Sequence, residues 1–185
     1  MAHVVIVLAS GRSERFRAAG GTGNKLDADL CGRAVLQRTL DAVRESGLSW
    51  HLETGPHPGM GDSIAAAVRH CADASGWLIL PGDLPLIQAQ TIRQVDAALA
   101  HAPVVVPQAV MPDGTVQRGH PVGFSQVCRD ALMALTGDMG AAPVVRAFGA
   151  QRLDIEDTGC CLDVDTPEWL DVARQRWLAR QASPR

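Results

Sequence analysis

The stretch Val4-Val5-Ile6-Val7-Leu8-Ala9-Ser10-Gly11-Arg12-Ser13-Glu14-Arg15 decides the fold, because an apolar run passes directly into a loop of small and basic residues. The apolar run is typical of a buried parallel strand. The small residues at positions 9–11 let a ligand approach the backbone closely. The two arginines and, further along, Lys25 add positive charge. The stretch therefore predicts a site for a flat anionic ligand such as a nucleoside triphosphate.

Two well-known phosphate loops do not fit this stretch. A P-loop needs Gly-Lys followed by Ser or Thr, and the chain has Gly23-Asn24-Lys25-Leu26. The dinucleotide fingerprint needs three glycines in fixed register after the strand, and only Gly11 is in place. An ordinary strand-to-helix turn with solvated basic residues remains the alternative interpretation.

Length and composition limit the possible partners. The chain has 185 residues and a formal net charge of −3, which argues against nucleic acid bound through a broad basic surface. No apolar run is long enough to span a membrane, and the N-terminal run does not resemble a signal peptide. The five cysteines are odd in number and form no CxxC pair, so we expect a reduced, cytoplasmic setting. Cys160 and Cys161 are interpreted as packed apolar residues.

Apolar periodicity and turn signals predict alternating strands and helices. This alternation predicts a mostly parallel sheet covered on both faces, in one domain over residues 1–180 with a tail at 181–185. Besides the first strand, we expect strands at 49–54, 77–81, 104–107, 119–124 and 151–155. We expect helices at 35–46, 63–74, 91–100, 126–135, 141–148 and from 167 onward, with Thr166 as the cap of the last one.

Acidic residues follow two of the apolar segments. Asp83 comes just after one predicted strand, and Asp163 and Asp165 follow another apolar segment. Mg²⁺ is usually held by one or two carboxylates together with substrate phosphates. Asp83 and Asp165 could supply these ligands, while Lys25 places a compact positive charge on the phosphates. The alternatives are a turn residue at Asp83, caps of the last helix at Asp163 and Asp165, and a solvated Lys25.

Six motifs follow one another in the order seen in one enzyme family. They are Val7 to Ser13 with Lys25, Gly59-Met-Gly-Asp-Ser63, Pro81-Gly-Asp83-Leu-Pro85, Gly119-His-Pro-Val122, Thr136-Gly-Asp-Met-Gly140 and Asp163-Val-Asp165-Thr-Pro-Glu168. In this order the chain resembles the MobA-like nucleotidyltransferases, and it is most similar to the molybdenum cofactor cytidylyltransferase (MocA type) branch. The resemblance covers nearly the whole chain.

The resemblance implies a fold, a reaction and a set of site residues. The fold is a Rossmann-like three-layer α/β/α sandwich of the glycosyltransferase-A type. The reaction transfers CMP from CTP to a phosphorylated acceptor, a molybdopterin-type cofactor, with Mg²⁺ and release of pyrophosphate. Lys25, Asp83 and Arg15 would be catalytic, and Asp83 and Asp165 would hold the metal. His120 and Asp138 would face the acceptor. The nucleotide would be bound by Leu8, Ala9, Ser10, Gly11, Arg12, Ser13, Lys25, Gly61, Ser63 and Asp83.

The chain departs from the family pattern at three places. Ser10 stands where the guanylyl branch tends to have glycine and the cytidylyl branch alanine. The loop between Arg15 and Lys25 is longer than usual. Residues 47–59 have room for one strand where the family has strand, helix and strand, so we expect the sheet to lack one edge strand. Guanylyl or other nucleotidyl transfer to a different phosphorylated acceptor, and a non-catalytic chaperone that hands the cofactor to a molybdoenzyme, remain alternative functions.

Overall fold

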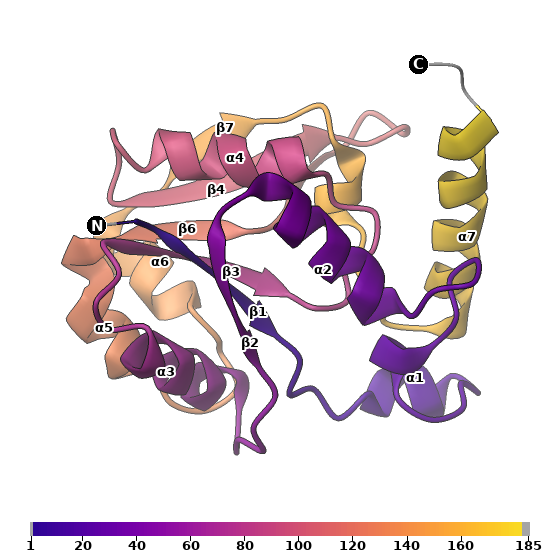
Figure 1. Cartoon of the computed structure of the whole chain (residues 1–185), viewed down its shortest axis with the longest axis horizontal. Helices are drawn as coiled ribbons and strands as arrows, with labels where there is room; N and C mark the ends of the chain where they lie inside the picture. The colour runs from indigo at the N-terminus through magenta and orange to yellow at the C-terminus, as the bar shows by residue number, and fades with distance from the viewer. Residues whose placement is uncertain (1, 183–185) are drawn as a thin grey trace.

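A computed structural model describes residues 2–182. These residues form one seven-stranded sheet with helices on both faces (Figure 1). The strands are β1 Val4–Leu8, β2 Ser49–Glu53, β3 Gly76–Pro81, β4 Val104–Val110, β5 Val116–Arg118, β6 Val122–Ser125 and β7 Gln151–Asp154. The α-helices are α1 Glu14–Ala18, α2 Val35–Ser46, α3 Met60–His70, α4 Ala89–Ala98, α5 Arg129–Met133, α6 Ala142–Phe148 and α7 Pro167–Ala182. Three 3₁₀ turns, η1 Lys25–Asp27, η2 Gln126–Cys128 and η3 Thr158–Cys161, complete the described elements.

Most strands of the sheet run in the same direction. β1 pairs in parallel with β2 and β3, and β4 pairs in parallel with β7. β6 is antiparallel to both β3 and β4, so β4 runs in the direction of β3. Among the strands of residues 2–182, only β5 and β6 are reversed, which confirms the mostly parallel α/β sheet predicted from the sequence.

β5 and β6 together form one interrupted strand along a single edge of β4. β7 occupies the other edge of β4 at Val105 to Gln108, so both β5 and β6 must pair on the opposite edge. The pairing register shifts by two residues between β5 and β6. The intervening segment 119–121, which includes a cis peptide bond between His120 and Pro121, therefore bulges out of the strand.

The two faces of the sheet bury separate groups of apolar side chains. Val5 and Val7 of β1 pack with α2 and α4, whereas Ile6 packs with α3, α5 and α6. This alternation follows from the twofold period of a strand, and the continuous apolar run of β1 results from burial on both faces. The result is the predicted three-layer α/β/α arrangement.

A third apolar cluster lies at the carboxyl end of β1 and fixes the loops there. It joins Phe16 of α1, Leu26 of η1 and Leu30 to residues next to and within α7, among them Val164 and Leu170. Figure 1 shows α1 beside the N-terminal end of α7. The segment after β1 and the segment before α7 are thus held together although about 140 residues separate them.

Several boundaries differ from the expected ones. β2 is the one strand between α2 and α3, as expected, and it forms an edge of the sheet. α3 begins at Met60, three residues before the expected start at Ser63, because Gly59 is still extended. α7 runs to Ala182, two residues into the expected tail, and residues 183–185 lie outside the described part. The domain limit at residue 180 stays a prediction. Among the described residues, no helix has the length and apolar character needed to cross a membrane.

Candidate active site

The site forms where β1 and β3 end side by side. Leu8 and Pro81 are paired in register, and the Gly82 N–H donates to the Leu8 carbonyl at 2.9 Å. A β-carbon at Gly82 would lie 3.0 Å from that same carbonyl oxygen, so glycine allows this close approach without displacing the neighbouring strand end. The next residue, Asp83, is therefore placed at the carboxyl edge of the parallel strands, where α/β sheets bind their ligands.

A backbone hydrogen bond brings the second acidic segment to Asp83. The Val164 N–H donates to the Asp83 carbonyl at 2.9 Å. Its neighbours Asp163 and Asp165 consequently lie beside Asp83, and the three side chains offer oxygen atoms that all lie within 4.8 Å of one another. The predicted meeting of Asp83 with Asp165 is present in the structure, and Asp163 joins them.

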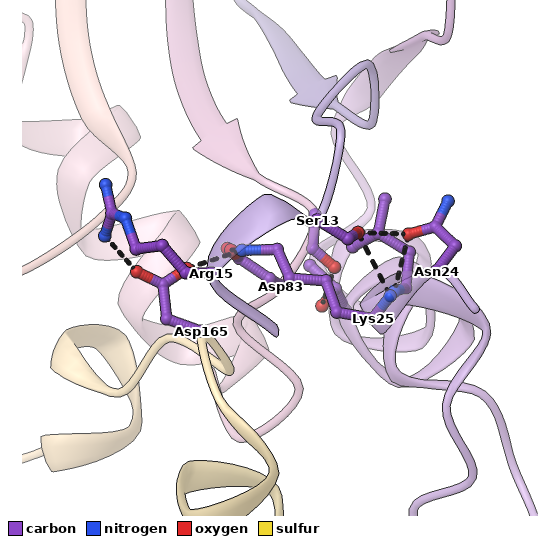
Figure 2. A network of polar contacts seen from close by, with 9 residues as sticks. Ser13, Arg15, Asn24, Lys25, Asp83 and Asp165 are labelled. Atoms are coloured by element: carbon purple, nitrogen blue, oxygen red, sulfur yellow. Dashed lines mark hydrogen bonds and ion pairs between the residues drawn. The ribbon is translucent and has the colours of Figure 1, made fainter. Parts of the chain in front are cut away.

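Lys25 bridges two of these carboxylates. Its Nζ donates to Asp83 Oδ2 at 2.5 Å and to Asp165 Oδ1 at 2.6 Å. The guanidinium of Arg15 donates to the other oxygen of Asp165. Figure 2 shows the Lys25 amine between the two aspartates, with Arg15 on the far side of Asp165. Lys25 is the single lysine of the chain, beside sixteen arginines.

The longer loop before Lys25 folds back on itself. The residues after Ser13 form α1, and a β-carbon at Gly21 would lie 2.3 Å from the ring of Phe16, so the loop packs closely on this helix. Ser13 itself is buried in the left-handed conformation with φ 54°. The extra residues thus form a compact turn that carries the chain back to Lys25.

Asn24 and Ser13 hold the backbone on the amino side of Lys25. Ser13 Oγ donates to Asn24 Oδ1 at 2.8 Å and accepts from the Lys25 N–H at 3.1 Å. Asn24 Oδ1 also accepts from the Leu26 N–H at 3.0 Å and caps η1. These hydrogen bonds, drawn in Figure 2, fix where the Lys25 side chain leaves the backbone.

The charges of the site shift the pKa values of its members. Burial would lower the pKa of Lys25, but the charge of Asp83 and the hydrogen bonds to Asp165 and Asp83 raise it. Burial likewise opposes ionisation of Asp165, yet the hydrogen bond and charge of Lys25 lower its pKa. Loss of solvent around the carboxyl group of Asp163, together with the charge of Asp83, raises the pKa of Asp163. Lys25 and Asp165 are therefore both charged near neutral pH.

The acidic cluster fits a divalent cation. Asp83 Oδ1 is buried and has no hydrogen-bond partner among the described residues. A buried oxygen left without a partner costs free energy, and a bound cation would remove this cost. Carboxylate oxygens are also the donors that hard divalent cations prefer.

The cluster opens into a cleft of about 740 Å³. Five segments form the wall of this cleft: the loop after β1, α3, the loop after β3, the bulge at 119–121 and the segment before α7. Most of the site residues that were predicted from the sequence lie in this wall. The predicted residues in its wall are Leu8, Ser10, Gly11, Arg12, Ser13, Arg15, Lys25, Ser63, Asp83, His120, Asp138 and Asp165.

Two predicted nucleotide-binding residues lie outside the cleft wall. Ala9 packs into the third apolar cluster, and its N–H donates to the Glu53 carbonyl at 2.8 Å. Gly61 is buried, and its N–H donates to the Gly137 carbonyl at 2.7 Å. A β-carbon at Gly61 would lie 2.7 Å from the Thr136 carbonyl oxygen, so this glycine allows α3 to contact the loop 136–140.

The two residues predicted to face the acceptor both line the cleft, in different surroundings. Burial lowers the pKa of His120 despite the nearby charge of Asp83, so the imidazole is neutral at pH 7. Its Nδ1 is buried and has no hydrogen-bond partner among the described residues. Asp138 is exposed, in a loop that is tied to α3 by the hydrogen bond from the Gly137 N–H to Asp62.

Sequence reasoning missed several residues of the cleft. The sequence favours a helix cap at Asp163, although its spacing of two residues from Asp165 is compatible with a shared site. Arg118 lines the cleft because it precedes the bulge, which no local signal predicts. Cys160 is fully buried as expected, but the partly exposed Cys161 lies with it in the cleft wall.

Comparison with known proteins identifies the family. The MobA-like NTP transferase domain matches residues 41–154, well over half of the chain. This chain belongs to the MobA-like NTP transferase family. The matched segment of this MobA-like NTP transferase contains Asp83, His120 and Asp138, and the acidic segment at 163–165 lies beyond it. The family is one of nucleotidyltransferases.

Curated and solved proteins are also similar to this chain. The bifunctional protein GlmU of Aromatoleum aromaticum is 27% identical over 201 residues, covering 95% of this MobA-like NTP transferase and 40% of the relative. The chain thus spans less than half the length of that curated relative. Rv0371c from Mycobacterium tuberculosis H37Rv has the same fold, with a TM-score of 0.79, 22% identity, and coverage of 95% of this chain and 99% of Rv0371c.

Two further solved structures share the fold. A second structure of Rv0371c is a complex with manganese and superposes with a TM-score of 0.74 at 22% identity, covering 95% of this chain and 99% of that one. The molybdopterin-guanine dinucleotide biosynthesis protein A of Archaeoglobus fulgidus has a TM-score of 0.67 and 16% identity, with coverage of 95% and 99%. At these identities the likeness shows the fold alone.

Proposed function

We propose that the chain is a Mg²⁺-dependent nucleotidyltransferase that transfers CMP from CTP to a phosphorylated acceptor of the molybdopterin type and releases pyrophosphate. The observation that carries this proposal is the convergence of Lys25, Asp83 and Asp165 in one cleft at the carboxyl ends of β1 and β3. The choice of cytosine and of molybdopterin rests on the motif resemblance. The free thiols of the chain fit a cytoplasmic location.

The loop after β1 supplies the parts needed to bind a triphosphate. Ser10, Gly11 and Arg12 line the cleft, and a β-carbon at Gly11 would have no neighbour within 4 Å, so the backbone there is open to a ligand. Backbone N–H groups in such a loop can hold phosphate oxygens. On this proposal Lys25 and Arg15 provide the cationic charge that offsets the triphosphate.

The reaction needs positioning and charge neutralisation more than proton transfer. An oxygen of the acceptor phosphate attacks the α-phosphorus of CTP and forms a new P–O bond. The bond from the α-phosphorus to the oxygen that bridges it to the β-phosphorus breaks, and pyrophosphate leaves with the electron pair. Because the second pKa of a phosphate monoester is about 6, the acceptor is largely ionised at neutral pH and needs no general base. The neutral, buried His120 agrees with this, since it would orient the acceptor without taking a proton.

Asp83 and Asp165 would hold Mg²⁺, with Asp163 beside them. The ion, when bound, offsets negative charge on the phosphates as the bond to the leaving group breaks. Asp83 is held in place because it follows the end of β3, where Gly82 is hydrogen-bonded to Leu8. Asp165 is held in place by the hydrogen bond from the Val164 N–H to the Asp83 carbonyl. The chain thus presents two carboxylates from distant parts of the sequence at a defined separation.

A direct test compares nucleotides and variants in a pyrophosphate-release assay. With a phosphorylated pterin acceptor, we expect release with CTP and Mg²⁺ that falls at least about 100-fold in Asp83→Ala, the scale of losing one electrostatic contact to a transition state. Asp27→Ala is the matched control, because Asp27 is exposed two residues after Lys25 and does not line the cleft. Release by Asp83→Ala at the wild-type rate would refute the proposal.

The nucleotide panel also separates the alternatives. A preference for GTP would replace CMP transfer by guanylyl transfer, as the name of the A. fulgidus relative suggests for that protein. Tight binding of the pterin without release from any nucleotide would favour the chaperone function. Bound nucleotide stabilises the fold by mass action, so thermal shifts with four NTPs give an independent ranking.

A further inference from the structure

Arg118 adds an unpaired positive charge to the wall of the cleft. It is the last residue of β5, it is exposed, and it lines the same cleft as Lys25 and the acidic cluster. Lys25 and Arg15 already donate hydrogen bonds to carboxylates of the site, whereas no described residue pairs with the guanidinium of Arg118. The charge of Arg118 is therefore available to an anionic ligand.

The sheet holds the backbone on both sides of Arg118. Arg118 is paired with Gln108 of β4, and the Gly119 N–H donates to the Pro107 carbonyl at 2.8 Å. A β-carbon at Gly119 would lie 2.7 Å from the Cys160 carbonyl oxygen, so glycine lets this segment pack against η3. The point from which the guanidinium extends is thus fixed relative to the strand ends.

The order of the strands gives the cleft two sides. β1 and β6 flank β3 on opposite sides, and Asp83 follows the end of β3. The loop after β1, which the proposed function assigns to the triphosphate, belongs to the first side. On the second side, β6 is antiparallel to β3 and Val122 is paired with Ile79, so the residues before Val122 continue along the carboxyl end of β3. Arg118 therefore belongs to the side of Asp83 that is opposite the triphosphate loop.

The proposed transfer reaction leaves this second side to the acceptor. In an in-line displacement, the attacking oxygen and the leaving pyrophosphate lie on opposite sides of the phosphorus atom. The pyrophosphate part of CTP would lie toward Lys25 and Arg15, so the acceptor phosphate has to approach from the side of β6. A phosphate monoester carries about −1.5 to −2 charges at pH 7, and it would approach a cluster of three carboxylates. A cation on this side would offset the repulsion.

Arg118 is the basic residue that this side offers. The other arginine and lysine residues in the described wall of the cleft all belong to the segment 12–25. A guanidinium can donate two parallel hydrogen bonds to a phosphate, whereas a lysine ammonium acts as a point charge. His120 lines the same wall, and its buried Nδ1 has no partner among the described residues. Two groups that can hydrogen-bond a ligand are therefore present on the side of β6.

We propose that Arg118 binds the phosphate of the acceptor and sets the preference for a phosphorylated over an unphosphorylated acceptor. This assignment rests on the proposed transfer to a phosphorylated acceptor, but it concerns binding and can be measured without turnover. Because the nucleotide lies on the opposite side of Asp83, loss of the guanidinium should weaken acceptor binding and leave CTP binding unchanged.

The test compares two ligands that differ only in the phosphate, 6-hydroxymethylpterin and its phosphate monoester. Their binding to the full chain is measured by pterin fluorescence in the presence of Mg²⁺ and a non-hydrolysable CTP analogue. The wild type should bind the phosphorylated ligand at least about tenfold more tightly, the scale of a hydrogen bond to a charged group. Arg118→Ala should abolish this preference, and Arg118→Lys should keep part of it. Arg146→Ala removes an exposed cation of α6 outside the cleft wall and should leave the preference unchanged.

Several results would overturn the assignment. They are equal binding of both ligands by the wild type, a preference that survives in Arg118→Ala, and a loss of CTP binding in that variant as large as its loss of acceptor binding. Thermal unfolding controls for folding, and Tm should not change because Arg118 is exposed and unpaired.

Pyrophosphate release, measured separately, distinguishes failure of this assignment from failure of the transfer function. A preference that depends on Arg118 without release from CTP would refute the transfer function and leave the phosphate site in place. Release by the wild type, together with an unchanged preference in Arg118→Ala, would refute the role of Arg118 alone.

Discussion

Replacing Lys25 by methionine leaves the carboxylates of the site without their central cation. The Lys25, Asp83 and Asp165 side chains are 14%, 12% and 23% exposed, so the pairs are largely shielded from water. Removing one partner of a buried ion pair costs about 3–5 kcal/mol, and partial exposure of Asp165 places the expected loss near the lower limit, about 3 kcal/mol. For a chain of this length, this corresponds to a fall in Tm of about 6–12 °C.

The loss should depend on pH in a definite direction. In the wild type the pKa of Asp165 is lowered, so its pairing stabilises the fold above its ordinary pKa and this stability is lost as pH falls through the folded pKa. In the variant, three neighbouring carboxylates repel one another when they are ionised, so stability falls as pH rises from about 4 toward 7. The difference in unfolding free energy should therefore be largest near pH 8 and shrink toward pH 4.

Chemical denaturation at pH 5 and pH 8 measures this difference. Arg33→Met is the matched control, because it removes an exposed cation from Asp41 and should leave the midpoint unchanged. Mn²⁺ should stabilise the Lys25→Met variant by about 2.7 kcal/mol at 100 times its Kd, because the ion replaces the missing charge. Equal stability of variant and wild type at pH 8, or a larger difference at pH 5, would refute this account of the site.

Other changes have equally definite outcomes. Asn24→Ala removes the acceptor for the Leu26 N–H and should cost about 1 kcal/mol in urea unfolding, whereas Asn24→Asp keeps the acceptor and should cost less. Gly11→Ala should leave Tm unchanged, since its β-carbon meets open space, but should raise the KM for the nucleotide. Gly61→Ala should lose about 1–3 kcal/mol by thermal unfolding, because its β-carbon would press on a carbonyl oxygen. In the wild type, stability should fall as pH drops below about 6.5, because the unfolded histidine gains a proton that the buried one resists. His120→Gln should remove this contribution to the pH dependence of stability.

The layered fold could be predicted because its signals are local and strong. The run from Val4 to Leu8 is apolar at successive positions, and the structure buries β1 from both sides. The space between Gly47 and Gly59 allows one strand, and the structure has β2 there alone. The start of α3 could not be predicted from local sequence, because Gly59 and the residues after it can adopt either extended or helical backbone. The contact of Gly61 with the distant loop 136–140 is what places the first turn of this helix.

The sequence predicts the acidic residues of the site, but it does not predict the contacts that bring the other residues to them. Asp83 and Asp165 stand out as acids that follow apolar segments, but their meeting depends on one backbone hydrogen bond from Val164. The bulge that brings Arg118 and His120 to the cleft arises from a register shift between β5 and β6, which leaves no mark in local sequence. The compact turn between Arg15 and Lys25 likewise depends on packing of Phe16 against α7 and its neighbours.

Crystals grown with Mn²⁺ and a non-hydrolysable CTP analogue would locate the ion through its anomalous scattering. We expect one manganese peak bound by Asp83 and Asp165, with the triphosphate in contact with Lys25 and with the loop after β1. A manganese peak away from both aspartates, or a triphosphate bound outside this cleft, would contradict the proposed role of the site.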